Sequence, residues 1–61
     1  MKKIFNVSVG DYIWFKHMPY GTIDEGVVTE IKSDLIKVAI IDESYDIWIS
    51  RSKITDVKKY G

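Results

Sequence analysis

The sequence predicts an all-β fold that forms a single domain over residues 1–61. Short apolar segments alternate with polar residues at a period of two, which is typical of strands that bury one face. Clusters of Gly, Asp, Ser and Pro separate these segments, as turn residues do between strands. Nowhere do apolar residues recur at helical spacing over two turns, so we expect no α-helix.

Size and charge limit the classes of function. The chain has 61 residues, no cysteine, and nine basic against nine acidic residues. It is near the lower size limit for folding without disulfides or metals, so burial of more surface in a homodimer would be favourable. The chain has zero net charge, so it lacks the excess of basic residues that duplex-DNA binding usually requires. Because there is neither a membrane-length apolar run nor a signal-peptide core, we expect a soluble, cytoplasmic protein without a membrane partner.

The first strand organises the expected fold. It lies within residues 9–16, where Gly10 and Asp11 form a turn that leads into a dense apolar and aromatic segment. Alternation places Ile13 and Phe15 in the core and Tyr12, Trp14 and Lys16 on the opposite face. Residues 3–9 also alternate, and they predict an N-terminal edge strand.

The next segments predict a long loop and a hairpin. Residues 17–25 contain the single proline, and long loops in compact domains are often functional. Strands are expected at 26–32 and 35–41, joined by a two-residue turn at Ser33 and Asp34. The second of these strands is apolar on both faces, so we expect it to be covered on both sides.

The C-terminal part predicts two more strands. After a turn at residues 42–44, a strand over 45–50 would place three side chains inward, namely Tyr45, Ile47 and Ile49. Its outward side chains would be Asp46, Trp48 and Ser50. A single 3₁₀ turn is expected over 50–53. The last strand, over 54–58, would contribute Ile54 and Val57 to the core, before a frayed end at residues 60–61. Five short strands in so small a chain favour a closed or partly open barrel, which limits exposed edges.

This pattern resembles the Tudor and PWWP group of SH3-like barrels, whose outline KOW-type modules share. The resembling segments run from about Val9 to Val57: Asp11-Tyr-Ile-Trp-Phe-Lys16, Tyr20, Gly26-Val-Val28, Ile36-Lys-Val-Ala-Ile-Ile-Asp42, Asp46-Ile-Trp-Ile49 and Ile54. The chain departs from PWWP domains in lacking the Pro-Trp-Trp-Pro run and the helices after the barrel. The resemblance implies a five-stranded SH3-like barrel and binding through aromatic residues near the barrel mouth.

The aromatic residues predict a surface for a protein partner. This surface consists of the outward Tyr12, Trp14 and Trp48, together with Tyr20 in the long loop. Following the resemblance, these residues would form a cage or groove for a cationic or extended ligand, and a methyl-lysine cage would add Asp24, Glu25 or Asp46. The alternative is that the N-terminal segment covers Trp14 and Trp48 as additional core. The short chain also fits a phage or mobile-element product that inhibits a host protein.

Two other functions remain open at this point. Basic residues early and late in the chain would share one side of a barrel and bind single-stranded nucleic acid: Lys16, Arg51, Lys53, Lys58 and Lys59. The alternative to this site is an ordinary surface of mixed charge. The aromatic face would otherwise serve as the interface of a structural homodimer.

Catalysis finds no support in the sequence. His17 is the single histidine and has no sequence-level partner, and there is no cysteine nucleophile, phosphate-binding loop or metal-ligand spacing. The acidic pairs Asp24-Glu25 and Asp42-Glu43 fall in expected turns, where such residues are common. We therefore expect a protein that is not an enzyme and needs no cofactor or metal.

Overall fold

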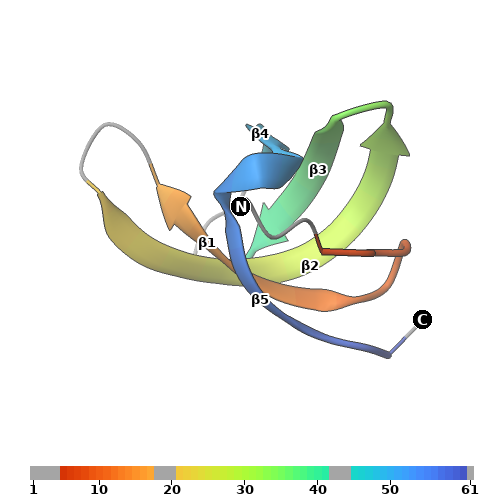
Figure 1. Cartoon of the computed structure of the whole chain (residues 1–61), viewed down its shortest axis with the longest axis horizontal. Coiled ribbons are helices and arrows are strands. Elements are labelled where there is room, and N and C mark those ends of the chain that lie inside the picture. Colours follow the sequence, from red (N-terminus) through yellow and green to blue (C-terminus); the bar gives the residue numbers. More distant parts are fainter. Residues whose placement is uncertain (1–4, 18–20, 42–44, 61) are drawn as a thin grey trace.

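Five antiparallel strands form one sheet in the computed structural model, which describes residues 5–17, 21–41 and 45–60. The strands are β1 (Tyr12–His17), β2 (Thr22–Lys32), β3 (Leu35–Ile40), β4 (Asp46–Ser50) and β5 (Ile54–Lys58). A 3₁₀ turn, η1 (Arg51–Lys53), connects β4 to β5, and the strand order is β4-β3-β2-β1-β5 (Figure 1). The prediction of an all-β fold is confirmed.

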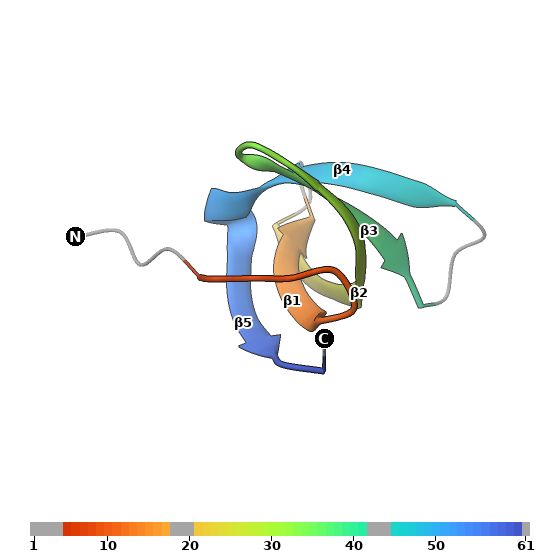
Figure 2. The ribbon, with the colours of Figure 1, turned by 90° about the vertical axis from the view of Figure 1, so that its right-hand side faces the viewer.

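The sheet is strongly curved, and β2 runs through both of its halves (Figures 1 and 2). The first part of β2 pairs with β1, from Thr22 to Val27, and the second part pairs with β3, from Gly26 to Lys32. Within the part of the chain that the structure describes, no strand pairing joins β4 to β5. The sheet is therefore not closed into a barrel.

The concave side of the sheet holds one hydrophobic core. Its buried members come from all five strands: Ile13, Phe15, Val28, Ile36, Val38, Ile40, Ile49 and Ile54. This confirms the inward face predicted for the first strand, and Ile49 and Ile54 are buried as predicted for the last two strands. Half-buried side chains pack around this cluster: Phe5, Val7, Ile31, Ile47 and Val57.

The long loop expected over residues 17–25 is wrong in its extent. β1 reaches His17 and β2 begins at Thr22, so that Phe15 pairs with Asp24 and Trp14 pairs with Glu25. The two acidic residues do not end the strand because Asp24 is only half-buried and Glu25 is exposed, which leaves both carboxylates access to water. The remaining residues of the expected loop, 18–20, lie outside the described residues.

Three further predictions are wrong: the N-terminal edge strand, the inward position of Tyr45, and the burial of both faces of the third strand. Residues 5–9 form no strand, although Phe5 and Val7 do pack on the core. Tyr45 precedes β4 and is exposed instead of inward. Leu35, at the start of β3, and Ile41, directly after β3, are also exposed. A single curved sheet has one concave side, so the outer side of a central strand stays in contact with water. The expected turn at residues 42–44 lies outside the described part.

Gly26 lies where the two halves of the sheet meet. It pairs with Ile13 on one side and with Ile40 on the other. A Cβ atom at this position would lie 2.4 Å from the carbonyl oxygen of Ala39 and 2.7 Å from Cγ1 of Val38. The close approach of the β3 backbone therefore requires glycine here.

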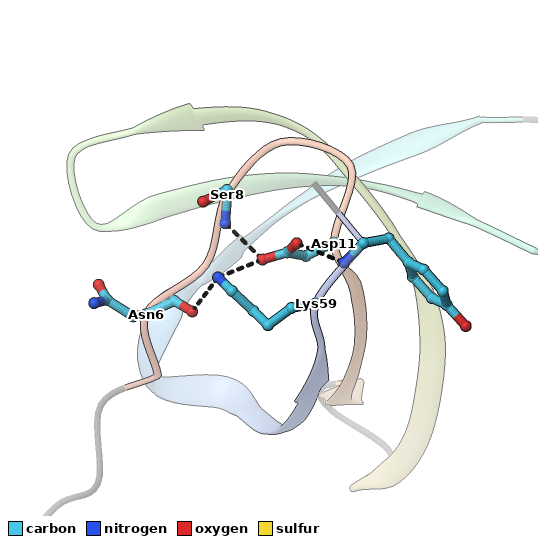
Figure 3. A network of polar contacts seen from close by, with 5 residues as sticks. Asn6, Ser8, Asp11 and Lys59 are labelled. Atoms are coloured by element: carbon cyan, nitrogen blue, oxygen red, sulfur yellow. Dashed lines mark hydrogen bonds and ion pairs between the residues drawn. The ribbon is translucent and has the colours of Figure 1, made fainter.

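Asp11 is the buried charged residue among those described, and it connects both ends of the chain to the start of β1 (Figure 3). Its Oδ2 accepts hydrogen bonds from the Ser8 amide at 2.8 Å and from Lys59 Nζ at 2.7 Å. Its Oδ1 accepts from the Tyr60 amide at 3.1 Å. Lys59 Nζ also donates to the Asn6 carbonyl at 3.0 Å, which closes the network.

We predict that Gly26→Ala destabilises the protein by at least about 2 kcal/mol, because the new methyl group overlaps backbone atoms that cannot move independently of the ladder. Urea denaturation followed by circular dichroism measures this loss. Gly21→Ala is the matched control, since no atom lies within 4 Å of a Cβ there, although its φ of +71° carries a backbone cost of its own. Equal stability of the Gly26 variant and the wild type would contradict the close approach.

We predict that Asp11→Asn costs about 2–4 kcal/mol of folding free energy, because an amide nitrogen would face donors where a carboxylate oxygen accepted. The same denaturation experiment measures it. Asp34→Asn, at an exposed turn residue, should stay within about 0.5 kcal/mol of the wild type. The assignment fails if the two variants are equally stable.

Candidate partner-binding surface

Tyr12 and Trp14 form an aromatic pair on the outer side of β1. Their ring centroids are 5.0 Å apart and their planes meet at 67°, an edge-to-face contact. Both side chains are half-buried. Alternation sends them away from Ile13 and Phe15, which are fully buried in the core. The predicted division of this strand into two faces is therefore confirmed.

The strand register places two carboxylates beside Trp14. Its cross-strand neighbours are Glu25 on β2 and Asp56 on β5. Directly paired residues share a face, with Cβ atoms about 4.5–5.5 Å apart. We call the group Tyr12, Trp14, Glu25 and Asp56 the aromatic–acidic surface.

A β-bulge shapes the side of this surface that β5 provides. The register shifts between Trp14 and Phe15, and the extra residue on β5 is Thr55. The Thr55 hydroxyl donates to the Trp14 carbonyl at 3.2 Å. Asp56 Oδ1 accepts from the Val57 amide at 2.8 Å, and the Asp56 side chain is exposed. The bulge thus fixes the position of Asp56 beside Trp14.

Two apolar side chains of the N-terminal segment lie on the other side of the sheet. Phe5 and Val7 pack against the core cluster, which includes the inward Ile13 and Phe15 of β1. This is the face opposite to Trp14. Phe5 and Val7 therefore do not cover Trp14, contrary to the alternative in which the N-terminal segment buries it.

Trp48 lies on a different part of the outer side. The register connects Tyr12 to Val27, Val27 to Ala39, and Ala39 to Asp46, which is three steps of about 4.8 Å along the curved sheet. From that row, Trp14 and Trp48 extend in opposite directions along the strands. The structure therefore brings Tyr12 and Trp14 together and keeps Trp48 apart from them. Tyr20 lies outside the described residues.

Trp48 has its own surroundings on β4. It is 43% exposed, and Lys37 Nζ lies 5.9 Å from the centre of its ring. Together with Lys32 and Leu35 it lines a shallow hollow. This hollow is apolar at its base and has lysines beside it, in contrast to the carboxylates beside Trp14.

Two of the five basic residues considered for nucleic-acid binding make internal contacts. Lys59 bonds to Asp11, as described above. The Arg51 amide donates to the Asp34 carbonyl at 2.8 Å, and its guanidinium donates to the Ser33 carbonyl at 3.3 Å. Arg51 therefore holds η1 against the β2–β3 turn.

The other three basic residues lie at separate positions. Lys58 is opposite Tyr12 in the register, and its Nζ lies 5.5 Å from the centre of the Tyr60 ring. Lys16 is exposed near the end of β1, and Lys53 is half-buried in η1. Asp56 lies on β5 between the positions of Lys53 and Lys58, so an acidic group interrupts the expected basic side.

The described residues contain no group of three or more His, Cys, Asp or Glu side chains that could hold a metal ion. In the same part of the chain, no helix is long and apolar enough to cross a membrane. Comparison of the chain with protein-family models, with curated proteins and with solved structures finds no significant match.

Sequence reasoning did not find Asp56 and assigned Glu25 to a loop. Asp56 is far from Trp14 in the sequence, and only the pairing of the last strand with the first makes them neighbours. A signal was present in the last strand, because its two inward residues, Ile54 and Val57, are three positions apart instead of two, as a bulge between them requires. The spacing does not tell which residue of β1 each of them faces.

Proposed function

We propose that this chain is a non-enzymatic interaction module that binds a protein partner through the aromatic–acidic surface. The observation that supports this most directly is the edge-to-face pair of Tyr12 and Trp14 held beside Glu25 and Asp56. Aromatic side chains of these types dominate the energetics of protein interfaces.

Lys58 lies opposite Tyr12, but both direct cross-strand neighbours of Trp14 are carboxylates, and they fit a cationic side chain of the partner. An arginine or lysine stacked on the indole ring gains a cation–π interaction. The carboxylates on either side then supply charge-assisted hydrogen bonds, which are stronger than neutral ones. Because both rings already rest on a hydrogen-bonded strand, little conformational freedom is lost on binding.

We also propose that the curved sheet represents a partly open SH3-like barrel of the Tudor, PWWP and KOW kind. Three features support this proposal: β1 to β4 follow one another as a meander, a 3₁₀ turn follows β4, and β5 returns to pair with β1. The strong curvature of β2 is the bend that such a barrel requires.

We predict that a random peptide library panned against the immobilised protein yields peptides rich in arginine or lysine. Trp14→Ala should weaken their binding at least about 30-fold, which corresponds to the 2 kcal/mol of an interface hot spot. The double variant Glu25→Gln and Asp56→Asn should weaken it about tenfold, since each carboxylate loses its charge. Fluorescence anisotropy with a labelled peptide measures both.

Two controls keep this experiment interpretable. Trp48→Ala removes the other outward tryptophan and should leave the affinity unchanged, while thermal melting of every variant checks that the fold persists. The double charge variant keeps all apolar contacts, so its effect is separate from any loss of stability. Peptides that bind equally well to all variants would refute the site. A labelled single-stranded oligonucleotide that binds more tightly than the peptides, with a steep salt dependence, would favour the nucleic-acid alternative instead.

A further inference from the structure

The strand β4 forms one margin of the sheet and pairs only with β3 among the described residues (Figure 2). An edge strand exposes a row of backbone amides and carbonyls that can pair with another strand. Two hydrogen bonds, one between β3 and β4 and one on the other side of β3, determine which residues of β4 present these groups to the free edge.

The first bond joins the Arg51 amide to the Asp34 carbonyl at 2.8 Å. These two residues continue the register in which Leu35 pairs with Ser50 and Ile36 with Ile49. In an antiparallel ladder, hydrogen-bonded pairs alternate with pairs that are not hydrogen-bonded. The backbone groups of Ile49 and Ile47 therefore point toward β3.

The second bond joins the Ile41 amide to the Glu25 carbonyl at 3.4 Å on the other side of β3. By the same alternation, Ala39 and Lys37 bond toward β2, and Ile36 and Val38 bond toward β4. Both bonds thus indicate that the same residues, Ile47 and Ile49, direct their backbone groups toward β3. The outward backbone groups of β4 thus belong to Asp46, Trp48 and Ser50, and β4 pairs with no other strand among the described residues.

This edge has little of the usual protection against pairing. β4 reads Asp-Ile-Trp-Ile-Ser and contains no proline, lysine or glycine, and its pairing with β3 shows no bulge. Its one charged residue is Asp46. The strand is also nearly symmetric about Trp48, with one isoleucine on each side.

We infer that β4 pairs antiparallel with β4 of a second copy of this chain, about a twofold axis at Trp48. Each Trp48 then exchanges two backbone hydrogen bonds with Trp48 of the second copy, and Asp46 exchanges two with Ser50 of that copy. Such an interface is self-complementary, because the same residues contribute from both copies.

Side chains agree with this register on both faces. Ile47 meets Ile49 of the second copy on the core side, where Ile47 is only half-buried in one copy. Exposed Tyr45 meets Arg51 of the second copy, and Asp46 meets an uncharged serine, so no like charges oppose each other. A second copy therefore pairs the outward backbone groups of β4 without placing like charges opposite each other.

The dimer leaves the aromatic–acidic surface free. β1 is separated from β4 by β2 and β3, so each dimer presents two such surfaces, which gives avidity toward a partner with repeated cationic sites. The pairing does not depend on the proposed function, since it uses a different strand and different residues.

Sedimentation equilibrium and amide hydrogen exchange test the inference together. We expect a monomer–dimer equilibrium for the wild type, with protection of the Asp46, Trp48 and Ser50 amides that rises with protein concentration. The Ile47 and Ile49 amides should be protected at every concentration, because they bond to β3. A dimer in which the three outward amides exchange freely would place the interface elsewhere and overturn the inference, as would a monomer at all concentrations up to about 1 mM, where even a weak association shows.

Trp48→Pro provides the matched variant. Its missing amide points to the free edge, so the β3–β4 ladder persists while dimerisation weakens at least about tenfold, the change expected for lost interface hydrogen bonds. Trp48→Thr keeps the amide and should retain concentration-dependent protection of the outward amides. Ile47→Pro removes a bond to β3 and should destabilise the monomer itself. If Trp48→Pro stays as dimeric as the wild type, the pairing is refuted.

Discussion

The buried carboxylate of Asp11 is the interaction on which the rest of this small structure depends. A chain without cysteine must hold its ends by other means, and Asp11 receives hydrogen bonds from Ser8, Lys59 and Tyr60. Removal of a carboxylate from water is costly unless such donors replace the water. The backbone of Asp11 also accepts from the Val28 amide at 2.9 Å, so the same residue fixes the start of β1 against β2.

The register that Asp11 fixes decides which aromatic residues face outward. A slip of one residue would bury Tyr12 and Trp14 and expose Ile13 and Phe15, because alternate side chains point to opposite faces. Placement of Asp56 beside Trp14 then depends on the pairing of β5 with β1, which directly precedes the Lys59–Asp11 contact in the chain. The polar network at the ends of the chain therefore supports the geometry of the aromatic–acidic surface, although none of its members belongs to that surface.

The predictable part of this fold is the part that depends on local pattern. Alternation identified the buried Ile13, Phe15 and Ile49, and the two-residue spacing identified the turn at Ser33, whose φ is +57°. The start of β2 was predicted too late in the chain because Asp24 and Glu25 are polar. Polar residues indicate a loop only where a strand would bury them, and in β2 both side chains can reach water. Asp11 looked like an ordinary turn residue, since its cation, Lys59, is 48 residues away. The cross-strand neighbours of Trp14 could not be predicted either, because they depend on the register of β1 against β2 and β5.

Exposed apolar side chains on this molecule have two different explanations. One curved sheet can bury only its concave side, so apolar residues on the outer side, such as Ile23 and Leu35, follow from geometry alone. Trp14 differs because carboxylates lie on both sides of it, and Trp48 differs because its backbone lies at the centre of a free edge. The organisation of the neighbouring groups, more than exposure itself, is the reason to propose a binding surface here beyond the unavoidable outer face of a small sheet.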